Sequence, residues 1–105
     1  MRKEGYAMFA RQTTFQFKTD QIDEVLKIIK ESIVPEAKSQ KGYQGLYFLL
    51  DRKTGKAVSI ALWDSEEDAI ANEKSHYYQE QLVKLLNFYR VSPIREGYEV
   101  IVKPE

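Results

Sequence analysis

The sequence has no cysteine among its 105 residues and has one histidine and one tryptophan. The absence of cysteine excludes disulfides, thiol nucleophiles and thiolate metal ligands, and it fits a reducing compartment, so we expect a cytoplasmic protein. A single histidine argues against a zinc site built from this chain. We therefore expect no metal and no other bound cofactor.

The chain also has no excess of charge and no long apolar run. Lys plus Arg and Asp plus Glu number 16 each, so no net field attracts nucleic acid or an acidic membrane surface. No segment approaches the ~20 apolar residues of a membrane span, and the N-terminal stretch has no apolar signal-peptide core. We expect one domain over residues 1–105, with residues 1–6 as a loose tail and without nucleic-acid or membrane partners.

Three segments are rich in β-branched and aromatic residues. The stretch AMFARQTTFQF over 7–17 predicts the first strand, and YQGLYFLL over 43–50 and KAVSIALW over 56–63 predict a hairpin closed at Gly55. The Pro and Gly of VSPIREG over 91–97 indicate a loop, followed by a last strand over 98–103.

Two segments between these strands show helical periodicity. The first follows a cap at Thr19 or Asp20, and Pro35 should kink it or end it with a restart. The second begins at Ser65, with Asp68 three residues on, and should break near Ser75.

This order predicts an α+β fold, a ferredoxin-like βαββαβ unit with an antiparallel sheet and both helices on one face. Alternation along 56–63 suggests that Val58, Ile60 and Leu62 meet the helices, which leaves Trp63 on the opposite face with Tyr47. That opposite face is too apolar to stay exposed, so we expect a homodimer through it.

The stretch GYQGLYFLLDRKTGKAVSIALWDSEEDA over 42–69 resembles the dimeric α+β barrel superfamily, within it the antibiotic biosynthesis monooxygenase-like domain. A Gly-aromatic-x-Gly start, a hairpin and a strand ending in Trp-x-Ser-x-Glu carry the likeness. The resemblance implies a dimeric α+β barrel. Its members include quinol and anthrone monooxygenases, haem-degrading enzymes and proteins without an assigned reaction.

The haem-degrading branch of this group is similar in having an Asn on the first strand, a Trp ending the third and a His in the second helix. Trp63 matches the Trp, and Gln12 falls near the Asn position. Spacing from the Trp would place the His near Asn72 or Glu73, whereas this chain has it at His76. This departure argues against haem.

Five residues are candidates for a substrate site, each with a structural alternative. Trp63 and Tyr47 could hold a flat ring, or could pack a core or dimer contact. Gln12 could hydrogen-bond a substrate oxygen, or could form a polar pair with Thr14 on an edge strand. Arg11 could be the inward residue instead if the strand is bulged, and could then stabilise a substrate oxyanion. His76 is a candidate general base, because imidazole is the side chain that most often takes this role near neutral pH, but a lone surface His is usually solvated.

The resulting hypothesis is a cofactor-independent monooxygenase of a small aromatic or quinol-type substrate, bound in the barrel pocket of a homodimer. Such a reaction requires ring binding, deprotonation and exclusion of water. One alternative is a non-catalytic dimeric module that binds a small ligand, and another is a haem-binding enzyme. The sequence leaves open whether the protein is an enzyme.

Overall fold

The computed structural model describes residues 8–104, except the side chains of residues 77 and 78, so the expected tail at 1–6 lies outside the described residues. The elements in chain order are β2 (Phe9–Phe17), a 3-10 turn (Thr19–Gln21), α1 (Ile22–Ile28), a π turn (Ile29–Ile33), α2 (Val34–Ala37), β3 (Tyr43–Leu50), β4 (Lys56–Trp63), α3 (Glu66–Glu73), α4 (His76–Leu85), a 3-10 turn (Leu86–Phe88) and β5 (Tyr89–Glu99).

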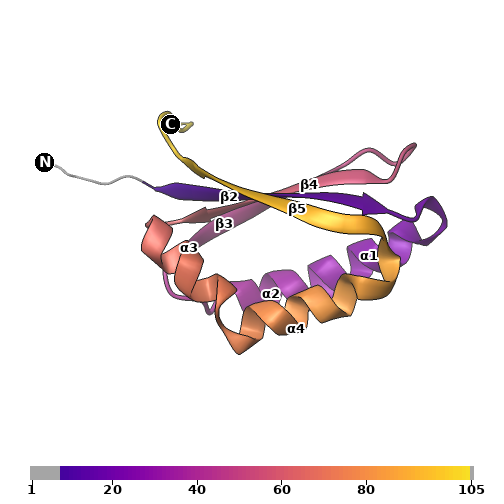
Figure 1. Ribbon diagram of the computed structural model, residues 1–105, viewed down its shortest axis with the longest axis horizontal. Helices are drawn as coiled ribbons and strands as arrows, with labels where there is room; N and C mark the ends of the chain where they lie inside the picture. Colours follow the sequence, from indigo (N-terminus) through magenta and orange to yellow (C-terminus); the bar gives the residue numbers. More distant parts are fainter. Residues whose placement is uncertain (1–7, 105) are drawn as a thin grey trace, which may run out of the picture.

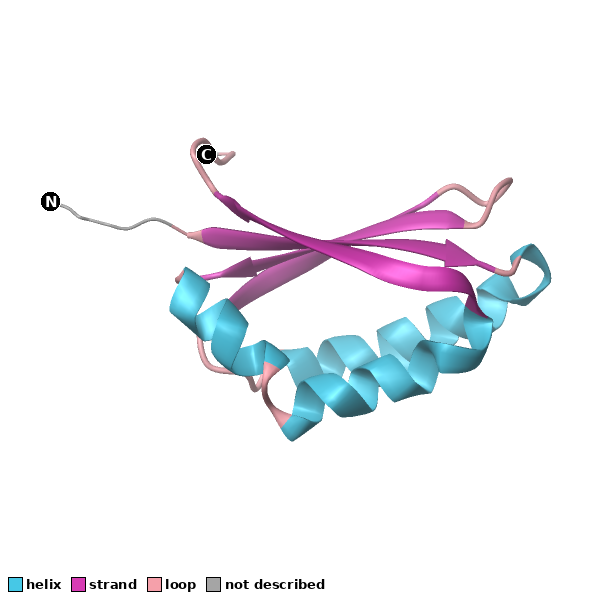
Figure 2. Ribbon diagram, in the orientation of Figure 1, coloured by secondary structure: helices cyan, strands magenta, loops and turns pink. Residues whose placement is uncertain are grey.

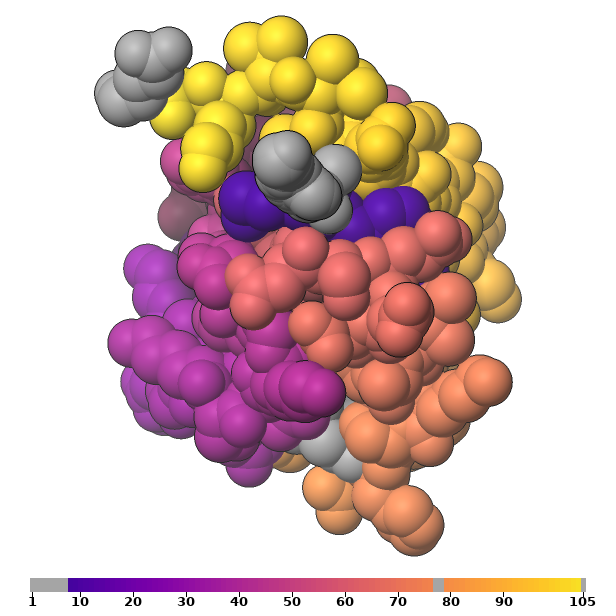
Figure 3. Space-filling model, turned by 90° about the vertical axis from the view of Figure 1, so that its left-hand side faces the viewer, coloured from indigo at the N-terminus to yellow at the C-terminus, as the bar shows by residue number. Residues whose placement is uncertain are grey.

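The strands form one antiparallel sheet in the order β3-β4-β2-β5. Within residues 8–104, all helices lie on one face of this sheet and none lies on the other (Figures 1 and 2). Seen from the end where α3 lies, the α1–α2 segment and the α3–α4 segment run side by side beneath the strands (Figure 3). The predicted ferredoxin-like α+β fold is therefore confirmed.

The core lies between the sheet and the helices, toward the start of α1. Phe17 and Val25 are its largest fully buried side chains, and Phe15, Ile22 and Leu85 pack around them. The rings of Phe15 and Phe17 are stacked with centroids 5.1 Å apart. Burial of such side chains contributes about 1.5–3 kcal/mol each, so this end holds the helices to the sheet.

The first helical segment runs through its proline without a gap, because α1, the π turn and α2 follow one another directly and the residues at their junctions are all helical. The predicted end and restart is therefore wrong, and Pro35 instead lies directly after a π turn, an irregularity that accompanies helix kinks. The preceding π turn is closed by the Val34 N–H, which donates to the carbonyl of Ile29 five residues earlier. The predicted cap is wrong, because neither Thr19 nor Asp20 caps this helix with its side chain.

The second helical segment begins and breaks as predicted. The Ser65 hydroxyl accepts a hydrogen bond from the Asp68 N–H at 3.1 Å. The Ser75 hydroxyl donates to the Asn72 carbonyl at 2.6 Å, between α3 and α4. This break allows α3 to lie over one end of the sheet and α4 to continue toward the other (Figure 1).

The last strand begins about nine residues earlier than expected. The predicted loop 91–97 lies within β5, whereas residues 100–103 are outside it. Pro93 is tolerated because β5 is an edge strand and its pairing with β2 shifts register between Thr14 and Gln16. Edges and bulges are the positions in a sheet where a missing N–H costs least.

The predicted faces of β4 are also reversed. Trp63 and Ala57 are buried under the helices, whereas Ile60 pairs with Tyr47 on the open face. The hairpin loop decides this register by placing Leu50 opposite Ala57. Large β3 side chains toward the helices are thereby paired with small β4 side chains, so both strands share one inner face without overfilling it.

Candidate functional site

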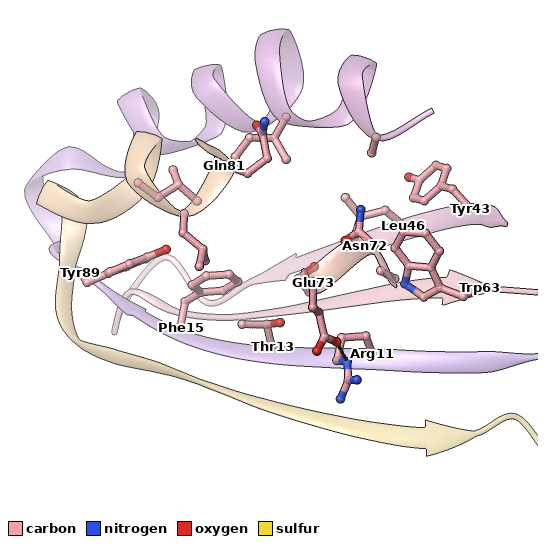
Figure 4. Close-up of a pocket in the computed structure, with 16 residues that line it drawn as sticks. Arg11, Thr13, Phe15, Tyr43, Leu46, Trp63, Asn72, Glu73, Gln81 and Tyr89 are labelled. Atoms are coloured by element: carbon pink, nitrogen blue, oxygen red, sulfur yellow. Dashed lines mark ion pairs between the residues drawn. The ribbon is translucent and has the colours of Figure 1, made fainter. Parts of the chain in front are cut away.

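A cavity of about 130 Å³ lies between the inner face of the sheet and the helices. Strand β2 contributes Arg11, Thr13 and Phe15 to it, and the helices contribute Ala37 and Leu85, among others (Figure 4). The small Ser59 and Ala61 side chains of β4 also line it. Most of the cavity wall is apolar, as in sites that bind small organic molecules.

One end of the cavity is formed by two aromatic residues. Trp63 ends β4 and Tyr43 begins β3, and their rings meet edge to face with centroids 5.8 Å apart. Trp63 is only 5% exposed, and burial raises the pKa of the Tyr43 hydroxyl. The Trp63 indole thereby forms an aromatic wall beside Asn72 and Glu73 of α3 (Figure 4).

Beside this wall lies an ion pair between Arg11 of β2 and Glu73 of α3. Both side chains are mostly shielded, and the Arg95 Nε lies 3.8 Å from the other Glu73 oxygen. The Arg11 Nε and Glu73 Oε2 atoms are buried in contact but are not aligned as a hydrogen bond. The guanidinium carries further N–H donors besides the one at Nε.

The opposite end contains Tyr89, the first residue of β5. Its ring lies 5.8 Å from both the Phe15 and Phe17 ring centroids, and burial raises the pKa of its hydroxyl to about 12. This hydroxyl has no hydrogen-bond partner among the described residues. In Figure 4 it points toward the interior of the cavity.

The helices above the cavity are tied together by polar side chains. The buried Gln81 of α4 donates from Nε2 to Glu36 Oε1 of α2 at 3.0 Å, and the Lys84 ammonium lies 2.9 Å from the same oxygen. Hydrogen bonds from Lys84 and Gln81 lower the pKa of Glu36. This network fixes the separation of α2 and α4 over the cavity.

The structure brings some of the sequence-predicted residues together and separates others. Trp63 and Arg11 line the cavity. Gln12 and Tyr47 lie on the open face, because they alternate with inner-face residues and both pair with Ile60. His76 is exposed at the start of α4, in a shallow groove with Glu36 and Gln79.

Sequence reasoning did not select Glu73 and Tyr89 as site residues. Glu73 carried one signal, because the spacing from Trp63 placed a family His at Asn72 or Glu73, and both residues do line the cavity. Tyr89 carried no such signal, because the residues next to it in the sequence do not show that its hydroxyl lacks a hydrogen-bond partner.

The cavity does not fit haem. The position beside Trp63 that would carry a proximal ligand holds Asn72 and Glu73, and Glu73 is already paired with Arg11. The one imidazole of the chain, His76, is not among the lining residues. Among the described residues, no group of three or more His, Cys, Asp or Glu side chains could hold a metal ion. Within residues 8–104, no helix has the length and apolarity needed to cross a membrane.

A family model described as antibiotic biosynthesis monooxygenase matches residues 8–81, and the chain belongs to this family. An uncharacterised Mycobacterium tuberculosis protein is 29% identical over 65 residues, which are 62% of this chain. That match spans only 29% of the mycobacterial protein.

Solved structures share the fold at low sequence identity. A Bordetella bronchiseptica protein, described as a candidate antibiotic biosynthesis monooxygenase, has a TM-score of 0.81 at 9% identity, over 92% of this chain and all (100%) of that one. A Nitrosomonas europaea protein of unknown function has a TM-score of 0.77 at 12% identity, over 94% of each chain. At such identities the likeness shows the fold alone.

Proposed function

We propose that this protein is a cofactor-independent monooxygenase of a small aromatic substrate that carries an acidic hydroxyl. The observation that carries the proposal is the apolar cavity with an Arg11–Glu73 pair beside the Trp63 wall. The cavity would exclude water from the ring, Trp63 would stack on it, and the charged pair would meet its hydroxyl. Membership of the family supports the same reaction class.

In the proposed reaction the substrate supplies all the electrons. Glu73 accepts the hydroxyl proton, and the Arg11 guanidinium stabilises the resulting phenolate. The electron-rich ring then reacts with dioxygen at an unsubstituted carbon. One C–O bond forms, that carbon loses its hydrogen, the second oxygen atom leaves as water, and the phenol becomes a quinone. Glu73 thus takes the role of base that the sequence suggested for His76.

The proposal is tested by oxygen consumption with a panel of phenols and naphthols, using isotopically labelled dioxygen. We expect one labelled oxygen atom in each product molecule and no accumulated hydrogen peroxide. Arg11→Met and Glu73→Gln should each lower turnover by roughly 10²-fold. Arg52→Met is the matched control, because Arg52 lies on the surface in an ion pair with Asp23. Wild-type protein that binds the phenols but consumes no oxygen would instead be a ligand-binding module.

We also propose that the working unit is a homodimer through the open sheet face. Tyr47, Leu49, Ile94 and Tyr98 are about half exposed or more, and all lie on that face by their pairing. Apolar area of this kind contributes about 25 cal/mol per Å² when a second copy covers it. Gln12 and Tyr47 would then act in the dimer contact rather than on substrate.

A further inference from the structure

We propose that Tyr89 recognises a second oxygen of the ligand, at the end of the cavity opposite Arg11. The site would thus select molecules that carry a hydrogen-bonding oxygen at each end of an apolar ring system. This inference rests on the proposed function, because it assumes that an aromatic ligand lies in this cavity.

The first argument is the environment of the Tyr89 hydroxyl. Its oxygen is buried and has no hydrogen-bond partner among the described residues. A buried hydroxyl without a partner is destabilising, and most such groups in folded proteins are paired. A phenylalanine would keep the stacking on Phe15 and Phe17 and avoid this cost. The hydroxyl therefore fits a group whose partner arrives with the ligand.

The second argument is its position. Tyr89 lines the same cavity as Arg11, and its hydroxyl points inward above Phe15 (Figure 4). Arg11 and Phe15 lie on one face of β2, four residues apart, which corresponds to about 13 Å along the strand. The wall between the two ends is mostly apolar. A ring spanning this wall would place its two ends at different polar groups.

The third argument is that the two ends differ in chemistry. Arg11 and Glu73 form a charged pair suited to an ionising hydroxyl. Tyr89 stays protonated at neutral pH, since burial raises its pKa to about 12, so it can donate to a carbonyl or hydroxyl oxygen. The ligand orientation follows from this difference, with its acidic oxygen at Arg11 and its neutral oxygen at Tyr89.

Calorimetric titration with matched probes tests the proposal. One pair is a naphthol and the naphthalenediol with a second hydroxyl at the far end of the same rings, and the longer pair is hydroxybiphenyl and its diol. In the wild type, at least one diol should bind more tightly than its partner. In Tyr89→Phe that preference should shrink by roughly three- to tenfold, while mono-hydroxyl binding stays within about twofold.

Tyr47→Phe is the control, because it removes a phenol hydroxyl from the open face. Tyr47→Phe should leave the affinities for the mono-hydroxyl probes and for the diols unchanged. The melting temperature of Tyr89→Phe should equal or exceed that of the wild type. A lower melting temperature would mean that the hydroxyl already has a partner, such as a trapped water, and would overturn the proposal. Equal loss of affinity for both members of each pair would also overturn it.

The outcomes for the two proposals are separable. Loss of the diol preference in Tyr89→Phe without any oxygen consumption would support this recognition role and reject the monooxygenase. Oxygen consumption with no diol preference in the wild type would support the monooxygenase and reject the recognition role of Tyr89. If the wild type binds none of the probes, both proposals fail.

Discussion

Gly97 of β5 lies directly opposite Arg11 of β2, and a methyl group built on Gly97 would come within 2.7 Å of Arg11 Nη1. The same methyl group would lie 2.5 Å from the tip of the Phe9 ring. The Arg11 guanidinium is itself 5.3 Å from the centroid of that ring. The absence of a side chain at residue 97 therefore leaves the space in which Arg11 reaches Glu73.

Gly97→Ala should displace the Arg11 guanidinium at little cost in stability, because the atoms it meets are the far ends of two side chains. We expect phenol affinity to fall several-fold while the free energy of unfolding changes by less than about 1 kcal/mol. Titration and urea unfolding measure the two effects. In an Arg11→Met background the same substitution should have no further effect on binding, since coupled residues are not additive. Additive losses would contradict the assigned contact.

Trp63→Phe should reduce ligand binding by removing ring area from the aromatic wall beside Tyr43. Shrinking a buried ring should also cost about 1–2 kcal/mol of stability. Phe17→Leu is the control, because Phe17 is fully buried in the core and does not line the cavity. That variant should lose at least comparable stability but keep phenol affinity. Equal affinity in the wild type and Trp63→Phe would make Trp63 a packing residue only.

Leu49→Arg should dissociate the proposed dimer, because it places a charge among the exposed apolar side chains of the open face. Leu49 is 50% exposed and pairs with Val58 on β4. Val83→Arg is the control on the outer surface of α4, where Val83 is 67% exposed. Sedimentation at micromolar concentration should show a wild-type and Val83→Arg dimer and a smaller or unfolded Leu49→Arg species. A wild-type monomer that is stable on dilution would reject the dimer.

Acid should loosen the contact between α2 and α4. Lys84 and Gln81 lower the pKa of Glu36 from its ordinary 4.5. A lowered folded-state pKa contributes stability that is fully present above about 4.5 and is lost as the pH falls through the folded value. Thermal melts from neutral pH to strongly acidic pH should show this loss in the wild type. Both Glu36→Gln and Lys84→Gln should flatten that part of the profile, and an unchanged profile would contradict the assignment.

The sequence predicted which segments form strands and helices better than it predicted which faces they bury. Periodicity and turn residues located the β3–β4 hairpin and the Ser65 cap because these depend on residues close in the chain. The inner face of β4 depends on its partner strand, where Leu50 and Phe48 oppose Ala57 and Ser59. The large side chains of Val58, Ile60 and Leu62 therefore suggested the wrong inner face for β4.

The cavity residues show the same limit. Arg11 and Glu73 are 62 positions apart, and their contact follows from the placement of α3 over β2. Pro93 similarly suggested a loop, because the sequence does not show that its strand lies at an edge. Information about local conformation was available in the sequence, whereas pairing between distant segments had to come from the structure.

The π turn at Ile29–Ile33 sets the rotational phase of α2. One additional residue in a helix turns everything after it by about 100° around the axis. In this protein, Ile33 and Ala37 come after the start of that turn and line the cavity. A relative with one residue fewer in this segment would present a different side of α2 to its ligand while keeping its strands in register. Single-residue length changes before Pro35 are therefore a route by which this fold can change its cavity without changing its sheet.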